Sequence, residues 1–195
     1  ATARCWEDWV LVRSGAPRGW GCRDLKHGAR LLEVVDQEVV KNIELMLGAT
    51  HYAVQTRDRR GAIPQAFFVL RVFEVRNLTR WKSHLARHVT PLTMENSSTQ
   101  GDDWASYVLS AMGKEPLDQR SNAHLLFHGA RSMETAQSIC CEGFDLSRAN
   151  VNSLCGPGAY LAEAITKSDE YAGGANGRAL LVCRAKLGRP WEVLT

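Results

Sequence analysis

The sequence predicts a mixed α+β fold, and three observations support that class. Segments with apolar residues at helical spacing alternate with short β-branched and aromatic runs along the 195 residues. Apolar residues make up 45% of the chain, which is enough to fill a core. No internal repeat or low-complexity tract interrupts the alternation, so we expect one domain with a small appendage.

The appendage is a Trp-rich extension at residues 1–34, ahead of a domain at residues 35–195. The extension holds three of the six tryptophans, which would pack on the main body or on a partner. Residues 9–23 alternate in polarity on both sides of a Gly-Ala-Pro-Arg-Gly turn, so the sequence predicts a β-hairpin there.

Residues 35–48 predict an amphipathic helix that ends at Gly48. Its apolar face would carry Val35, Val39, Ile43, Met46 and Leu47. The following run at 66–75 is β-branched and aromatic, and it is short enough for a strand.

Residues 77–88 predict a second helix, with Asn77 as its N-cap. Its apolar face would carry Leu78, Trp81 and Leu85. A polar loop at 89–101 and a short helix at 102–113 follow, and we treat residues 89–120 as an insert in the domain.

The second half of the chain alternates quickly between short elements. The pattern predicts a strand at 123–129, a helix at 132–144, a loop at 145–158, an extended-then-helical segment at 159–172 and a strand at 178–188.

The net charge of +3 does not indicate a nucleic-acid-binding protein, because the basic residues are scattered. The densest basic cluster, Arg57, Arg59 and Arg60, predicts a solvated turn. The six cysteines include no Cys-x-x-Cys pair and fit no zinc template, so no metal site and a reduced, intracellular protein are expected. No apolar run approaches the roughly 18 residues of a membrane span.

Two glycine-containing motifs predict a binding slot. His128 ends the strand at 123–129, and Gly129 leaves a backbone N–H and C=O that a primary amide could pair with. Further on, Gly156 and Gly158 would clear space beside the ring of Tyr160.

Ser168 and Tyr171 lie three residues apart, so a helix would place them on one face. Together with Tyr160 they form two aromatic walls and a polar end. Such a slot suits a flat carboxamide such as nicotinamide.

Three stretches resemble one known family: LLFHGARSMETAQSICCEGFD, GPGAYLAEAITKSDEYAGG and GRALLVCRAKLG. They are similar to the catalytic domain of poly(ADP-ribose) polymerases (PARPs), which are diphtheria-toxin-like ADP-ribosyltransferases, and the tankyrase type is the most similar branch. The resemblance runs from about residue 35 to 195. It implies an ADP-ribosyltransferase fold of antiparallel sheets with flanking helices.

The resemblance also implies an activity: the family binds NAD as substrate and transfers ADP-ribose to an acceptor, releasing nicotinamide. His128 and Tyr160 would be the catalytic residues, with His128 bonded to the adenosine ribose and Tyr160 flanking the pocket. The Gly129 backbone and Ser168 would bind the carboxamide, and Tyr171 would stack on the nicotinamide ring.

Asp145 stands where some members have a residue near adenine. The expected partners are NAD and a protein acceptor or a larger assembly.

The chain departs from the family pattern at Ala130, Pro157 and Leu161. The family also places a catalytic Glu on a later strand, whereas this chain stops at Thr195 and Glu192 aligns with an earlier strand. A C-terminally truncated domain is therefore expected.

Two other functions remain open. A catalytically inactive scaffold of the same fold is the main one, and an RNA 2′-phosphotransferase shares the fold and a His-Gly strand. Toxin-like transferases are disfavoured because the chain has no Glu-x-Glu.

Overall fold

A computed structural model describes residues 5–13, 23–24, 28–34, 36–89, 103–173 and 178–189, with the side chains of residues before Gly28 and of Asp103 left undescribed. Its centre is one six-stranded antiparallel sheet in the order β2-β3-β4-β1-β6-β5. The strands are β1 Cys5–Arg13, β2 Arg23–Asp24, β3 Arg30–Glu33, β4 Arg71–Arg76, β5 Ala123–Ala130 and β6 Arg178–Lys186.

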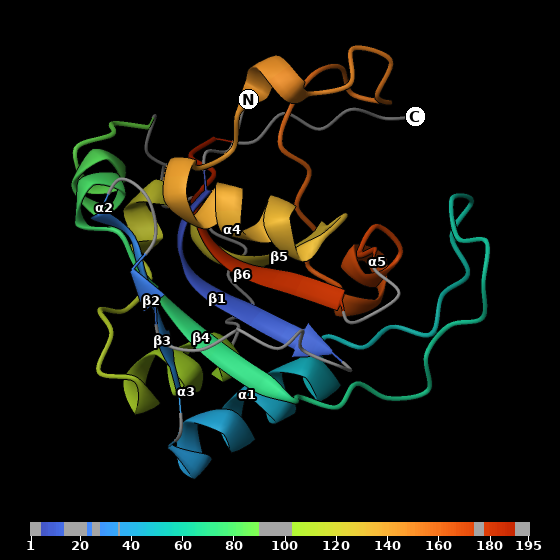
Figure 1. Cartoon of the computed structure of the whole chain (residues 1–195), viewed down its shortest axis with the longest axis horizontal. Helices are drawn as coiled ribbons and strands as arrows, with labels where there is room; N and C mark the ends of the chain where they lie inside the picture. Colours follow the sequence, from blue (N-terminus) through green and yellow to red (C-terminus); the bar gives the residue numbers. More distant parts are fainter. Residues whose placement is uncertain are drawn as a thin grey trace.

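Helices cover both faces of the sheet, which confirms the α+β class (Figure 1). In that view α1 and α3 lie against one face and α4 lies against the other, while α2 and α5 stand near opposite ends of the sheet. The helices are α1 Gln37–Ala49, α2 Leu78–Leu85, α3 Asp103–Ala111, α4 Met133–Glu142 and α5 Ile165–Asp169, with single 3-10 turns at Gln119–Ser121 and Leu146–Arg148.

The two faces of the sheet bury separate hydrophobic clusters because side chains alternate along each strand. On β6, Leu180 and Val182 join the cluster formed with α1 and α3, whereas Leu181 and Cys183 join the cluster formed with α4. Phe127 of β5 is fully buried in the first cluster.

The predicted hairpin at 9–23 is wrong in its pairing. β1 forms as a strand, but it lies between β4 and β6, with Trp9 opposite Glu74 on one side and Val182 on the other. Both edges of β1 are therefore occupied, and β2 pairs with β3 instead. The sheet thus includes strands from both sides of the domain boundary that we predicted at residue 34, and the extension's tryptophan side chains lie outside the described residues.

Helix α1 confirms its predicted apolar face, since Val39, Ile43, Met46 and Leu47 are buried. The first helix ends one residue later than predicted, at Ala49. The predicted strand at 66–75 begins only at Arg71, and Phe68 before it is 74% exposed.

The predicted apolar face of α2 is wrong. Asn77 caps this helix as expected, accepting a hydrogen bond from the Arg80 N–H at 3.2 Å. Leu78 and Leu85 are exposed, however, and His84 is the residue buried on α2.

The segment that we predicted as an insert contributes to the core. Ala105, Val108 and Leu109 of α3 are buried in the same cluster as α1. None of the helices that the structure describes is long and apolar enough to cross a membrane. Cys140, Cys141 and Cys183 are buried free thiols, and Cys155 is an exposed one.

Candidate active site

The free edge of β5 is the first part of the candidate site. One edge of β5 pairs with β6, whereas on the other side Phe127 uses both backbone groups on Ala162: its N–H donates at 2.8 Å and its C=O accepts at 2.9 Å. Backbone groups alternate between the two edges of a strand. The N–H and C=O of Gly129 therefore face the same outer edge as those of Phe127.

The second part is the backbone of α5, which lies directly against Gly129. A Cβ atom on Gly129 would lie 2.0 Å from the Ser168 carbonyl oxygen and 2.8 Å from the Ala172 nitrogen. Glycine is therefore required here because a helix approaches the strand, and not only because a ligand might. The contact places Gly129 and Ser168 side by side, as the sequence predicted for two residues of one slot.

Ser168 is 3% exposed, and within the described ranges no hydrogen bond joins its hydroxyl to another residue, although this oxygen is not one of the fully buried polar atoms that lack a partner. The hydroxyl next to the free edge of Gly129 is therefore available to a polar ligand group.

His128 lies on β5 between Phe127 and Gly129 and is half-buried. Its Nδ1 bonds the Tyr160 carbonyl oxygen at 2.9 Å, and its ring meets Phe144 edge-on at 4.8 Å between centroids. A carbonyl oxygen only accepts, so Nδ1 carries the proton and a neutral ring leaves Nε2 as an acceptor. Burial lowers the pKa of His128, and the hydrogen bond to the Tyr160 carbonyl raises it less. The net lowering favours the neutral ring near pH 7.

Tyr160 is tied into its own loop. Its hydroxyl donates to the Gly156 carbonyl at 2.6 Å and accepts from the Cys155 N–H at 3.1 Å. Gly156 has φ +79°, a left-handed conformation that favours glycine. A Cβ on Gly158 would meet nothing within 4 Å, so nothing in the described structure requires a glycine at this second position.

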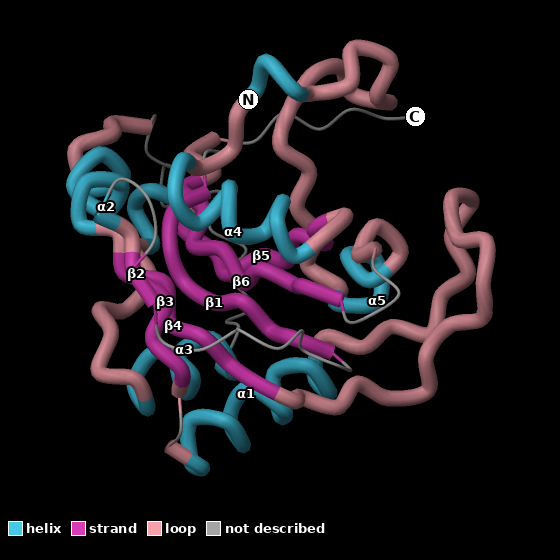
Figure 2. The backbone as a smooth tube through the Cα atoms, viewed as in Figure 1, coloured by secondary structure: helices cyan, strands magenta, loops and turns pink. Residues whose placement is uncertain are grey.

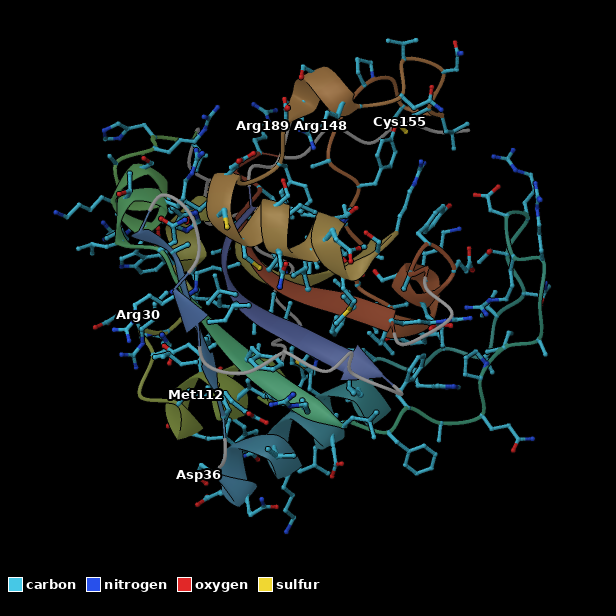
Figure 3. The ribbon with its side chains drawn as sticks, in the orientation of Figure 1. Arg30, Asp36, Met112, Arg148, Cys155 and Arg189 are labelled. Atoms are coloured by element: carbon cyan, nitrogen blue, oxygen red, sulfur yellow. The ribbon has the colours of Figure 1, made fainter. Side chains whose placement is uncertain are left out.

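Asp145 is also held locally. Its Oδ1 accepts from the N–H of Ser147 at 3.0 Å and from the Ser147 hydroxyl at 2.7 Å, and its Oδ2 pairs with Arg148 at 3.3 Å. These bonds to Ser147 lower the pKa of Asp145. Figure 3 places Arg148 and Cys155 on the loop above α4, on the side of the sheet opposite to Asp36 and Met112.

Tyr171 follows α5, and its N–H donates to the Ser168 carbonyl at 3.1 Å. Its ring is 49% exposed, and its hydroxyl donates to Asp58 Oδ2 at 2.9 Å. Lys167 Nζ stands 5.1 Å from the ring centroid. Burial and the Asp58 carboxylate raise the pKa of Tyr171, so its hydroxyl stays protonated at neutral pH.

The structure therefore links the predicted residues in two pairs: His128 bonds the Tyr160 backbone, and Gly129 contacts Ser168, from which Tyr171 is one turn away. Within the part of the chain that the structure describes, the side chain of Asp145 bonds residues of its own turn only. The prediction missed Asp58, because no local pattern signals a carboxylate whose partner is 113 residues away. In the described residues, no group of three His, Cys, Asp or Glu side chains is placed to hold a metal ion.

A comparison with protein-family models agrees with this arrangement. The model described as the poly(ADP-ribose) polymerase catalytic domain matches residues 38–195, which is most of the chain and includes β4 to β6 and every site residue above. The chain belongs to the poly(ADP-ribose) polymerase catalytic-domain family.

Proposed function

We propose that the edge of β5 and the backbone of α5 form a nicotinamide slot, and that this domain binds NAD and transfers ADP-ribose to an acceptor. The observation that carries the proposal is the contact between Gly129 and Ser168. It sets an outward-facing backbone N–H and C=O beside Ser168, a buried residue whose hydroxyl no described residue bonds. A primary carboxamide has the complementary donor and acceptor.

The remaining groups suit the rest of NAD. Tyr171 offers a half-exposed ring for stacking on the pyridine ring, a contact worth about 0.5–1.5 kcal/mol beyond burial. His128 Nε2 can accept a hydrogen bond from a ribose hydroxyl, which is the role that the resemblance gives it. Tyr160 would form one side of the pocket, and its carbonyl would hold the His128 ring in place through their hydrogen bond. Asp145 would lie toward the adenine end of the bound NAD.

In the transfer step, the bond between nicotinamide and ribose breaks as a nucleophilic atom of the acceptor attacks the anomeric carbon, nicotinamide leaves as a neutral molecule, and any proton on the attacking atom passes to water. Positive charge develops on the ribose, as in glycoside hydrolysis. The slot residues hold the leaving nicotinamide by its amide, while His128 orients the adenosine part of the molecule.

The test is calorimetric titration of the chain with NAD, with nicotinamide as competitor. We expect NAD to bind, nicotinamide to displace it, and Tyr171→Ala to abolish measurable binding. Tyr107→Ala is the matched control, because Tyr107 is a 70% exposed tyrosine on α3. A folded chain that binds neither NAD nor nicotinamide would refute the proposal.

A catalytically inactive, NAD-binding scaffold of the tankyrase type is the second candidate. It is favoured by the exposed apolar side chains Val151 and Leu154 on the loop that carries Tyr160, which suit a protein partner. Nicotinamide release from NAD separates the two: a transferase releases it together with modified acceptor, and a scaffold binds NAD without releasing it.

A further inference from the structure

The long loop between α1 and β4, residues 50–70, reaches from one end of the sheet to α5 (Figure 2). We call it the α1–β4 loop. Its first residue, Thr50, is hydrogen-bonded to α5: the Thr50 carbonyl accepts from the N–H of Ile165, the first residue of α5, at 3.0 Å. Its two arms are joined by a bond between His51 Nε2 and the Pro64 carbonyl at 2.7 Å.

Arg57 and Arg60 of this loop are exposed, as predicted for a solvated turn, but the prediction is wrong for Arg59. Its side chain is only 6% exposed. Its Nη2 donates to the Thr166 carbonyl at 2.5 Å and lies 3.7 Å from Asp169 Oδ2, and its Nε lies 3.4 Å from Glu170 Oε1. One guanidinium thus contacts three residues of α5 and its C-terminal end.

These contacts bear on the slot because they hold the helix segment that carries Ser168. Asp169 is fully buried and also accepts from Arg178 of β6 at 2.9 Å, so the helix is tied to the loop on one side and to the sheet on the other. Loss of Arg59 would leave Asp169 with Arg178 and Glu170 with Lys167, each with one positive partner fewer in a buried place, so Arg59 contributes to holding the segment in this position.

Asp58 contacts Tyr171, the residue that would stack on nicotinamide in the slot. Its Oδ2 accepts a hydrogen bond from the Tyr171 hydroxyl at 2.9 Å, and Lys167 Nζ lies 3.5 Å from the same oxygen and 5.1 Å from the ring centroid. Lys167 also pairs with Glu170 at 2.8 Å, and Thr56 of the loop donates to Glu170 at 2.5 Å. The tip and one face of the Tyr171 ring are therefore held by protein groups before any ligand arrives.

We propose that Asp58 and Arg59 are positioning residues for the nicotinamide slot: Arg59 holds α5 against β5, and Asp58 fixes the Tyr171 ring in its stacking orientation. This inference rests on the proposed function. Ordering a side chain on binding weakens affinity, so a ring fixed beforehand should bind nicotinamide about three- to tenfold more tightly than a free one.

The test for Asp58 is a double-mutant cycle on nicotinamide affinity, measured by calorimetry on the full chain. Asp58→Ala and Tyr171→Phe should each weaken binding about three- to tenfold, and the double variant should be no weaker than either single one, because all three lack the same hydrogen bond. Asp58→Asn should recover part of the affinity, because its amide oxygen can still accept from the hydroxyl. Such a pattern would not arise from a general loss of stability.

For Arg59, the matched pair is Arg59→Met and Arg60→Met, since Arg60 is exposed and makes no hydrogen bond or ion pair to another described residue. The first should weaken nicotinamide binding and lower the unfolding temperature, and the second should change neither. If the wild type binds and the Asp58 and Tyr171 effects multiply, or if Asp58→Ala binds like the wild type, this inference is wrong while the proposed function stands. If the folded wild type does not bind nicotinamide at all, both are wrong.

Discussion

Gly129→Ala is the substitution whose effect the structure determines most directly. The added methyl group would lie 2.0 Å from the Ser168 carbonyl oxygen, and ordinary van der Waals contact begins at 3.4 Å. Helix α5 would therefore have to move outward by about 1.4 Å. The atoms that the methyl group would meet, the Ser168 carbonyl oxygen and the Ala172 nitrogen, belong to the backbone and cannot rotate away.

Overpacking of this kind costs about 1–3 kcal/mol. For a chain of 195 residues that corresponds to a fall in the unfolding temperature of about 2–12 °C. Nicotinamide affinity should fall as well. The outward shift moves the Ser168 hydroxyl away from the Gly129 backbone groups, so the two could no longer bind the same carboxamide together.

The assay is thermal unfolding together with nicotinamide titration, and Gly48→Ala is the control. A Cβ at Gly48 meets nothing within 4 Å, and the residue lies in α1, so alanine should raise stability by about 0.5–1 kcal/mol. The reasoning is refuted if Gly129→Ala unfolds at the wild-type temperature and binds nicotinamide normally.

Two further substitutions test the contacts that join the helices to the fold. Asn77→Ala should destabilise the chain by about 2–4 kcal/mol in urea, because Asn77 caps α2 and its amide also donates to the carbonyls of Cys140 and Cys141 at 3.1 and 2.9 Å; a loss below about 1 kcal/mol would contradict this. Ser132→Ala should cost only about 1 kcal/mol in the same assay, since it removes the exposed cap of α4 alone, and Ser132→Asp should restore it.

Local signals explain what the sequence could predict. Asn77 caps the helix that it precedes, as predicted, because a cap depends on a few neighbouring residues. The buried face of α1 follows from the spacing of its own apolar residues. Gly129 and Ser168 lie together, as their motifs predicted, whereas the binding roles of His128, Gly129 and Ser168 stay predictions.

Long-range contacts explain what was missed. Arg59 has the local sequence of a surface arginine, but in the fold it pairs with Asp169 and Glu170, which are more than 100 positions away in the chain. β1 reads as half of a hairpin until β4 and β6 take both of its edges. The errors therefore concentrate where a residue's partner is distant in sequence, and the α1–β4 loop is such a place.

The error on α2 leads to the last prediction, which concerns His84. This side chain is 3% exposed and stacks on Trp81, with 5.3 Å between the ring centroids. Burial, reinforced by the nearby charges of Lys186 and Arg184, lowers the pKa of His84 from 6.5 to about 4. The folded protein therefore holds a neutral His84 at pH values where the unfolded chain protonates it.

Because the folded pKa is depressed, the unfolded state binds more protons between pH 6.5 and pH 4, and stability must fall as the pH falls through that window. The full difference corresponds to at most about 3 kcal/mol. We expect urea denaturation of the wild type to show this loss and His84→Gln to lack it, with carboxylate titration common to both proteins. Parallel stability curves for the two proteins between pH 6.5 and 4.5 would mean that His84 titrates normally in the fold, and that α2 does not bury it against β6.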